Sequence, residues 1–177
     1  MLEKSFAFPQ KVLPLLAREG VTAFPLVPTM AALIVQLANF DPAWARGVRY
    51  LTNTAAALPP AHILRLQQLF PRARVYSMYG MTESKRCTWL PPAELARRPD
   101  SVGIAIPGTQ AWVADDAGRP LPAGETGELV VRGGHVMQGY WNNPEATARA
   151  LKPGRYPWER VLHTGDLFRM DDEGFLY

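Results

Sequence analysis

The chain has 177 residues, of which 47% are hydrophobic and 20% are charged, and its formal net charge is +3 at pH 7. These values are typical of a globular protein and exclude a disordered or fibrous one. The small net charge and the shortness of the basic cluster at Arg97 and Arg98, which has no interleaved aromatic residues, argue against nucleic-acid binding. The only cysteine, Cys87, excludes an internal disulfide and is typical of a reducing compartment, so we expect a cytoplasmic protein.

The first 100 residues alternate short apolar runs with segments of helical periodicity. This pattern is typical of an α/β domain in which helices cover a largely parallel sheet. In chain order, the predicted elements are a helix over residues 10–19, a strand over 21–26, a helix capped by Thr29 and ending near Phe40, a strand over 48–52, a helix beginning at Pro60, and a strand over 74–77. The last strand leads into the segment MYGMTE at residues 78–83, and open α/β sheets tend to bind ligands just beyond such strand ends.

Proline and glycine are concentrated between residues 91 and 108, and we place a boundary within this region, near Ser101. Beyond it, strand and turn signals replace helical ones. The predicted strands cover residues 110–114, 127–132, 167–170 and 174–177, with turns at 115–118 and 171–174. The sequence therefore predicts an α/β subdomain over residues 1–100 and a mainly β, barrel-like subdomain over residues 101–177. Tyr177 falls inside the last strand, as expected for a chain cut from a longer protein.

Neither membrane insertion nor secretion is expected from the sequence. The longest apolar stretches are interrupted by Pro25, Pro28 and Gln36, and they are shorter than the roughly 20 residues of a membrane-spanning helix. The N-terminus, with Glu3 and Lys4, has no apolar core of the kind found in a secretory signal.

Three side chains near the end of the strand over residues 74–77 have the chemistry of a nucleotide site. The ring of Tyr79 could stack on a base, the Thr82 hydroxyl could bond a phosphate oxygen, and Glu83 could help to hold Mg²⁺, which prefers oxygen ligands. The alternative is a capped loop, in which Thr82 and Glu83 satisfy backbone groups at a helix start while Tyr79 packs on the core.

A second candidate is the segment HTGDL at residues 163–167. Its glycine permits a tight turn, and the two oxygens of Asp166 match two adjacent ribose hydroxyls, a solution known from other nucleotide sites. An ordinary turn aspartate is the alternative. The three histidines, His62, His135 and His163, are isolated from one another and from Cys87, which argues against a zinc site or a nucleophilic triad.

Taken together, these segments resemble the adenylate-forming ligase superfamily. The resemblance is carried by YGMTE, by HTGDL some eighty residues later, by GELVVRGGHVMQGYWNNPEAT between them and by GVTAFPLVPTM near the start. Within the superfamily, TNTAAALPP and LPPAELARRPDSVG look most like acyl-CoA ligases. The resemblance implies part of the large N-terminal domain of such an enzyme. Its reaction makes an acyl-adenylate from a small-molecule carboxylic acid and ATP, and then passes the acyl group to a thiol, for which coenzyme A is expected.

The resemblance also implies roles for particular residues. Tyr79 matches the tyrosine that stacks on adenine, Thr82 the threonine at the α-phosphate, Glu83 the magnesium ligand and Asp166 the ribose-binding aspartate. The loop Thr54-Ala55-Ala56 falls where relatives usually have Gly-Gly-Ala beside the adenine and acyl pocket, so the shape of this pocket differs. Gly80 keeps the backbone small next to the nucleotide. Thr82 and Glu83 are the candidate catalytic residues.

Two parts of such an enzyme have no counterpart in this sequence. One is the phosphate loop, rich in Gly, Ser and Thr and ending in Lys, and the other is the hinge with the small C-terminal domain and its catalytic lysine. We therefore expect a catalytically inactive internal piece whose partners are the remaining parts of its own parent chain. The alternatives are a stand-alone nucleotide-binding or interaction module, part of a peptide-synthetase adenylation domain, or a purely structural protein.

Overall fold

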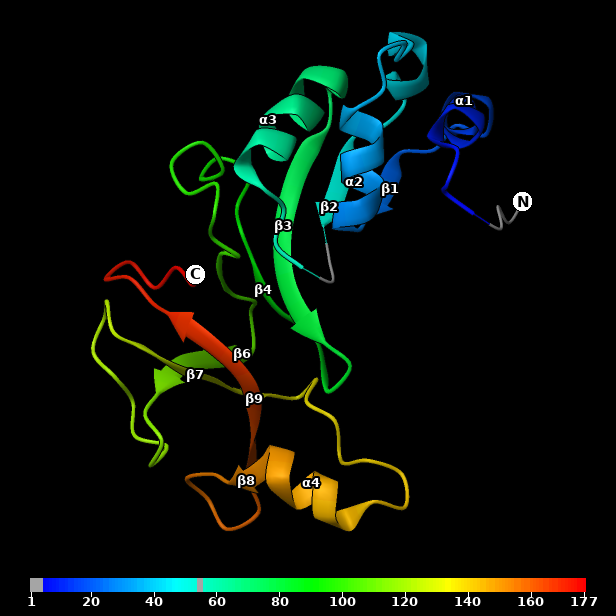
Figure 1. Ribbon diagram of the computed structural model, residues 1–177. Helices are drawn as coiled ribbons and strands as arrows, with labels where there is room; N and C mark the ends of the chain where they lie inside the picture. The colour runs from blue at the N-terminus through cyan, green and yellow to red at the C-terminus, as the bar shows by residue number, and fades with distance from the viewer. Residues whose placement is uncertain (1–4, 54–55) are drawn as a thin grey trace. The chain divides into compact units, whose positions relative to one another are not determined.

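The computed structural model describes residues 5–53 and 56–177, which form two compact units (Figure 1). The first unit comprises the chain up to Met78 together with Leu90–Asp100. The second comprises Tyr79–Trp89 and Ser101–Tyr177. The segment that carries Tyr79, Thr82 and Glu83 therefore clusters with the β-rich end of the chain.

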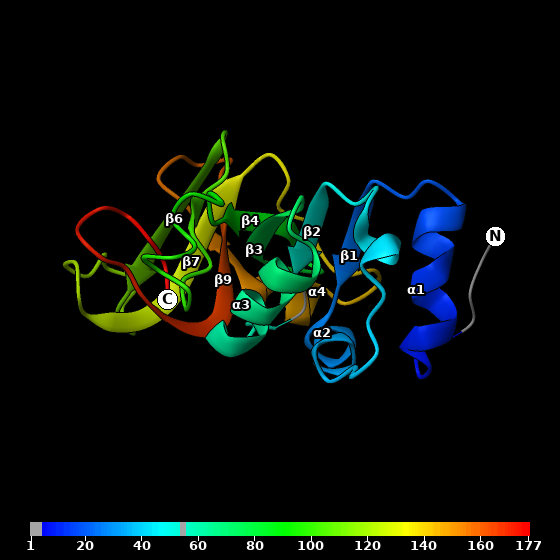
Figure 2. The same cartoon turned by 90° about the horizontal axis from the view of Figure 1, so that it is seen from above.

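Parallel strands form the centre of the first unit. They are β1 (Ala23–Leu26), β2 (Tyr50–Asn53) and β3 (Arg74–Met81), and Tyr50 pairs with both Ala23 and Arg74. The helices are α1 (Pro9–Arg18), α2 (Pro28–Val35) and α3 (Pro60–Leu69), with a 3₁₀ helix, η1 (Pro42–Ala45). Helices α2 and α3 contact each other and lie over one face of the strands (Figures 1 and 2). The predicted α/β class is confirmed.

Prolines mark the start of each helix of this unit, because a fixed φ and a missing amide suit the first helical turn. This feature corrects one prediction. Thr29 does not cap α2: the helix begins at Pro28, and Val27 is its N-cap residue without a side-chain hydrogen bond. The helix also ends at Val35 rather than near Phe40, because the amide of Leu37 bonds to Ile34 in a tighter turn.

Strand β3 is longer than the sequence pattern predicted. It continues to Met81, and a turn at Thr82 and Glu83 connects it to β4 (Ser84–Trp89), which neighbours it in the strand order β1-β2-β3-β4-β5. The short strand β5 (Ile104–Ala105) pairs antiparallel with β4. Thr82 and Glu83 are therefore not at a helix start, which removes the helix-capping alternative for them.

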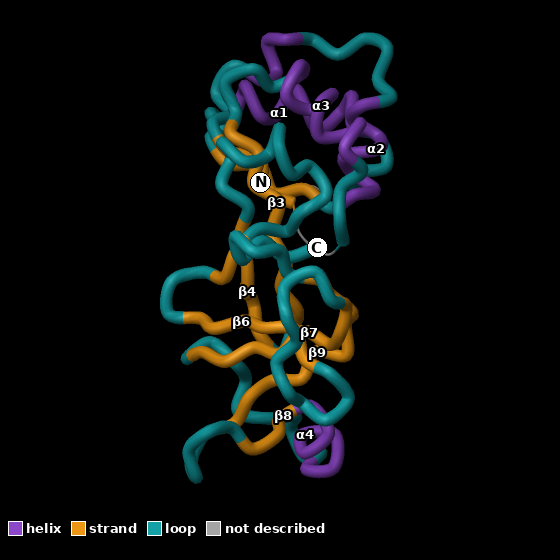
Figure 3. The backbone as a smooth tube through the Cα atoms, turned by 90° about the vertical axis from the view of Figure 1, so that its left-hand side faces the viewer, coloured by secondary structure: helices purple, strands orange, loops and turns teal. Residues whose placement is uncertain are grey.

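The second unit contains a four-stranded antiparallel sheet in the order β6-β7-β9-β8 (Figure 3). Its strands are β6 (Thr109–Ala114), β7 (Thr126–Gly133), β8 (Leu151–Pro153) and β9 (Arg160–Arg169). The mainly β character is confirmed, but the barrel-like description is wrong, because within the described residues β6 and β8 remain the two edges of an open sheet. Strand β8 has only three residues and cannot extend the sheet into a closed ring.

One helix of the second unit has no counterpart among the predicted elements. Helix α4 (Pro144–Ala150) begins after Asn143, whose side chain accepts a hydrogen bond from the amide of Ala146. An N-cap asparagine followed by proline and Glu145 is a helix-start signal that the sequence does contain.

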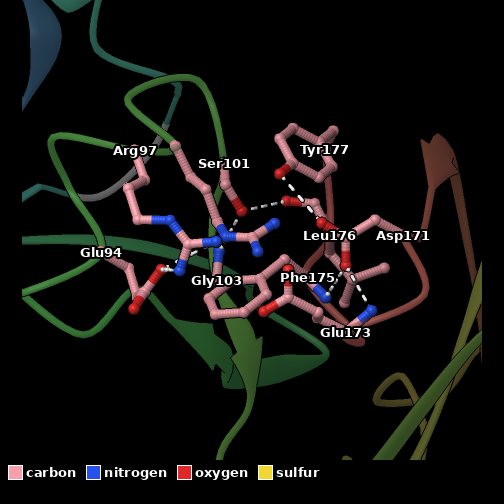
Figure 4. Close-up of polar contacts among 10 residues, drawn as sticks. Glu94, Arg97, Ser101, Gly103, Asp171, Glu173, Phe175, Leu176 and Tyr177 are labelled. Atoms are coloured by element: carbon pink, nitrogen blue, oxygen red, sulfur yellow. Dashed lines mark hydrogen bonds and ion pairs between the residues drawn. The ribbon is translucent and has the colours of Figure 1, made fainter.

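The C-terminal residues are held by polar contacts within the second unit (Figure 4). The Ser101 hydroxyl donates to the carbonyl of Leu176 at 2.7 Å, and Leu176 also exchanges backbone hydrogen bonds with residues 102 and 103. Asp171 accepts from the amides of Glu173 and Phe175, which confirms the predicted turn at 171–174. No helix in the part of the chain that the structure describes is long and apolar enough to cross a membrane.

Apolar side chains from several strands form the core of the second unit. Its larger cluster of buried residues consists of Cys87, Val113, Leu129, Val131, Leu151, Leu162, Phe168 and Leu176. Tyr79 and Met81 pack against this cluster with part of their surface still accessible. The core thus supports β3, β7 and β9 at the points where the candidate site residues lie.

Candidate nucleotide site

Tyr79 and Asp166 are 87 residues apart in the sequence but form a direct hydrogen bond. The Tyr79 hydroxyl, on β3, donates to Oδ2 of Asp166, on β9, at 2.6 Å. The Tyr79 ring also packs edge-on against Phe168, with ring centroids 4.9 Å apart. Burial raises the pKa of Tyr79 well above its ordinary value, and the hydrogen bond and negative charge of Asp166 raise it further. The phenol therefore remains a donor to Asp166 at neutral pH.

Asp166 lies in a bulge of β9. Glu128 on β7 pairs with Leu167 and Val130 pairs with His163, so Leu129 alone faces residues 164–166. The bulge includes Gly165 at a φ of 76°, a conformation that favours glycine. Asp166 is therefore neither a residue of a regular strand nor a simple turn aspartate, and its side chain is exposed.

Side chains replace the ladder hydrogen bonds that the bulge interrupts. The Thr164 hydroxyl donates to the carbonyl of Leu129 at 2.8 Å and lies 3.2 Å from the amide of Asp166, from which it accepts. The amide of Gly165 donates to Oε1 of Glu128 at 2.9 Å. The other oxygen of Glu128 lies 2.7 Å from Nδ1 of His163. The residues around Asp166 are thus fixed by specific polar contacts.

Glu83 forms hydrogen bonds with the loop that contains Met137 and Tyr140, a contact that was not predicted from the sequence. The hydroxyl of Tyr140 donates to Oε1 of Glu83, and the amide of Met137 donates to the carbonyl of Glu83 at 2.8 Å. The hydrogen bond to Glu83 raises the pKa of Tyr140. Thr82, at the same turn, is exposed.

A groove of about 720 Å³ lies within the second unit beside these residues. Its lining includes Glu83, Tyr140, Glu128, His163, Thr164 and Gly165. Tyr79 and Asp166 are not among the residues that line it, although Asp166 directly follows Gly165. The groove therefore adjoins the Tyr79–Asp166 pair without containing it.

The structure explains the presence of glycine at position 80 by packing between strands, without a ligand. A Cβ atom at this position would collide with the backbone of Lys85 on the neighbouring strand β4. Of the predicted loop at residues 54–56, Thr54 and Ala55 lie outside the described residues. Ala56 is exposed in the first unit, and its carbonyl accepts a hydrogen bond from the side chain of Asn53.

Glu83 is compatible with a magnesium site to which the protein contributes a single carboxylate. Among the described residues, no group of three or more His, Cys, Asp or Glu side chains could hold a metal by itself. Mg²⁺ in phosphate-transfer sites is usually held by one or two carboxylates, substrate phosphates and water, so a single carboxylate at a groove fits this mode. Tyr140 bonds one of the two oxygens of Glu83.

Two residues of the site escaped the site predictions. Glu128 and Tyr140 both fall inside the long segment from Gly127 to Thr147, which was used only as evidence for the resemblance. A glutamate at a strand start and a tyrosine in a Gly-rich loop carry no chemical signal until their partners are known.

Comparisons with known proteins identify the family. The family model for AMP-binding enzymes matches residues 1–141. The 4-coumarate--CoA ligase-like 4 protein of Oryza sativa subsp. japonica is 36% identical over 160 residues, which cover 89% of this chain and 28% of that protein. Feruloyl-CoA synthase of an Amycolatopsis species is 34% identical, and the match covers 96% of this chain and 33% of the synthase.

A solved structure shares this fold over the whole chain. The N-terminal domain of FACL13 from Mycobacterium tuberculosis is 30% identical with a TM-score of 0.84, and the match covers all of this chain and 42% of that one. The chain spans about a third of the length of the two curated relatives named above. By the match over most of its length and by its fold, the chain belongs to the AMP-binding family of adenylate-forming enzymes and is acyl-CoA ligase-like.

Proposed function

We propose that this chain supplies the adenosine-binding part of an ATP-dependent, AMP-forming carboxylic acid:CoA ligase. The observation that carries the proposal is the pairing of Tyr79 with Asp166 at 2.6 Å. It brings an aromatic ring and an exposed carboxylate from distant segments to one place. An aromatic face suits a base, and a carboxylate suits two adjacent ribose hydroxyls.

The geometry of the pair is compatible with a bound nucleoside. Of the two carboxylate oxygens of Asp166, only Oδ2 accepts a hydrogen bond from Tyr79. A carboxylate has about four lone-pair positions, so acceptor capacity remains for the ribose hydroxyls. The glycine at position 165 leaves open space where a Cβ would stand, which suits a close approach of ligand to backbone.

Thr82 and Glu83 are the proposed phosphate and metal contacts. Both lie in the turn between β3 and β4, three and four residues after Tyr79, and Glu83 faces the groove. When bound, Mg²⁺ would neutralise charge on the phosphates. Fixed contacts of this kind gain most of their catalytic effect from positioning and from stabilising charge that develops in the reaction.

For the whole protein we propose two steps. The carboxylate of the acid attacks the α-phosphorus of ATP, which forms the acyl-adenylate and releases pyrophosphate. The thiol of coenzyme A then takes the acyl group and AMP leaves. Support for coenzyme A comes from relatives whose names describe a CoA ligase and a CoA synthase. The single cysteine, a free and buried thiol, supports a reducing compartment such as the cytoplasm.

Calorimetric titration of the 177-residue chain with AMP tests the proposal. We expect binding by the unmodified chain and at least about tenfold weaker binding by Asp166→Asn, because a hydrogen bond to a charged group contributes about 1.5–3 kcal/mol and 1.4 kcal/mol corresponds to tenfold. Asparagine retains an acceptor for the Tyr79 hydroxyl, so the pair itself survives the substitution.

Asp116→Asn is the matched control, since Asp116 is an exposed aspartate of the same unit in the turn after β6. This variant should bind AMP like the unmodified chain. If the unmodified chain binds no AMP, or if Asp166→Asn binds it equally well, the adenosine role is wrong. Lack of AMP binding would favour the alternative of an interaction module.

A further inference from the structure

In the bulge that carries Asp166, backbone amides that no longer pair with strand β7 require other hydrogen-bond acceptors. Opposite residues 164–166, strand β7 offers only the backbone of Leu129. A backbone amide is a strong hydrogen-bond donor, and where the ladder offers it no carbonyl, a side chain that accepts from it fixes the local backbone conformation.

Glu128 meets this need from the neighbouring strand with both of its oxygens. Oε1 accepts from the amide of Gly165 at 2.9 Å, and Oε2 lies 2.7 Å from Nδ1 of His163. The carboxylate therefore connects the residue before Thr164 with the residue after it. A bidentate contact of this kind defines both the position and the orientation of the segment.

The charge of Glu128 is suited to this contact. Burial raises its pKa, but hydrogen bonds from His163 and Gly165 and the nearby charges of His163 and Lys152 outweigh that effect, and the pKa lies below its usual value. Glu128 is therefore ionised at neutral pH and can only accept. His163 must then carry its hydrogen on Nδ1, because that nitrogen faces the carboxylate.

The His163 side chain connects Glu128 to the start of the bulge. Its side chain is only 11% exposed, and it occupies the last regular pairing position of β9 before the bulge, opposite Val130. Lys152, whose charge also lowers the pKa of Glu128, lies on β8 and lines the same groove. The His163 ring is thus largely buried and in direct contact with the Glu128 carboxylate.

We propose that Glu128 is a positioning residue that sets the place of the Asp166 carboxylate by clamping the bulge through the Gly165 amide and the His163 ring. The importance of this clamp for nucleotide binding rests on the adenosine role proposed above. Glu128 does not need to touch the nucleotide, because it acts through the backbone of residues 163–166.

The test combines NMR spectroscopy with AMP titration of the 177-residue chain. In Glu128→Gln the side-chain oxygen can still accept from the amide of Gly165, but the NH₂ group that replaces the other oxygen is a donor and cannot accept from Nδ1 of His163. We expect the ring hydrogen to move from Nδ1 to Nε2, which the ¹⁵N shifts of the ring report, and the backbone resonances of Asp166 to shift. AMP binding should weaken about tenfold, the loss expected for one hydrogen bond to a charged group.

Glu159→Gln is the matched control. Glu159 also accepts from a backbone amide, that of Arg155 at 2.7 Å, and pairs with a cation, Arg132 at 3.1 Å, but it makes these contacts away from the bulge. If removal of a carboxylate clamp acts only through stability, both variants should lose AMP affinity equally. We expect the control to leave the His163 ring shifts and AMP affinity unchanged.

The two arms separate the inference from the proposed function. If the unmodified chain binds no AMP, the adenosine role fails, and the NMR arm still decides whether Glu128 positions Asp166. Unmoved Asp166 resonances in Glu128→Gln overturn the inference, and so does unchanged AMP affinity in a chain that binds AMP. Glu128→Ala should give the larger effect, while the near-isosteric Gln variant keeps the test valid if the Ala variant does not fold.

Discussion

At the scale of single residues, the hydroxyl of Tyr79 links the proposed adenine and ribose contacts. Its donor bond to Asp166 requires a protonated phenol, and ionisation would place two negative charges on atoms 2.6 Å apart. Burial and the nearby carboxylate both favour the neutral phenol, which is why the pKa of Tyr79 is raised.

This raised pKa predicts a dependence of stability on pH. A group whose pKa is higher in the folded state contributes stability below its unfolded pKa and loses it as the pH rises through the folded value. We expect the free energy of unfolding of the unmodified chain, relative to Tyr79→Phe, to decline as the pH rises above about 10. Urea unfolding of both variants between neutral and alkaline pH measures this difference.

Asp166→Asn serves as the control for the origin of the effect. It removes the charge but leaves burial in place, so the alkaline decline relative to the matching Tyr79→Phe double variant should become smaller. A decline of the same size with aspartate or asparagine at position 166 would contradict a contribution from the Asp166 charge.

At the scale of elements, β9 carries both the core and the candidate site on one strand. Leu162 is fully buried in the core of the second unit, whereas Leu167, on the other side of the bulge, is 75% exposed. The bulge between them allows the strand to supply buried residues and an exposed carboxylate within a few positions.

Two substitutions of the same chemistry test this division of β9. Leu162→Ala should lower the free energy of unfolding by about 2–5 kcal/mol, because a cavity remains in a packed core. Leu167→Ala should change it by no more than about 0.5 kcal/mol, as expected at an exposed position. Denaturant unfolding measures both, and equal losses would contradict the register of β7 and β9 described here.

At the scale of the whole molecule, the proposed nucleotide contacts are one part of the groups that we expect a ligase of this family to need. The chain spans about a third of the length of the 4-coumarate--CoA ligase-like protein and the feruloyl-CoA synthase, and its sequence contains no Gly/Ser/Thr-rich loop ending in lysine. We therefore expect the chain by itself to bind AMP without catalysing acyl-adenylate formation.

A pyrophosphate-exchange assay on the 177-residue chain measures this activity. Exchange that depends on a carboxylic acid should fall several orders of magnitude below that of a full-length relative assayed alongside, because electrostatic stabilisation of the phosphates is usually the largest catalytic contribution. Robust acid-dependent exchange by this chain would show that it needs no further segment for the first step.

The sequence alone determined part of the secondary structure and the family. Helix and strand patterns depend on neighbouring residues, so the helices near residues 10, 30 and 60 and the strands β1, β2, β3, β6 and β7 could be predicted. Strands β4, β5 and β8 and most of β9 were not predicted, the strand expected over residues 174–177 forms only isolated bridges at Leu176, and Thr29 was wrongly expected to cap a helix that begins at Pro28. The motifs at Tyr79 and Asp166 were also recognisable, because each is a short run of specific residue types.

Only the tertiary structure decided how these motifs meet. The hydrogen bond between Tyr79 and Asp166, the clamp of Glu128 on the bulge and the contact of Tyr140 with Glu83 join residues 35 to 87 positions apart. Such contacts depend on strand order and register, which local patterns do not specify. For the same reason the open edges of the four-stranded sheet, predicted as barrel-like, became known only from the pairing of its strands.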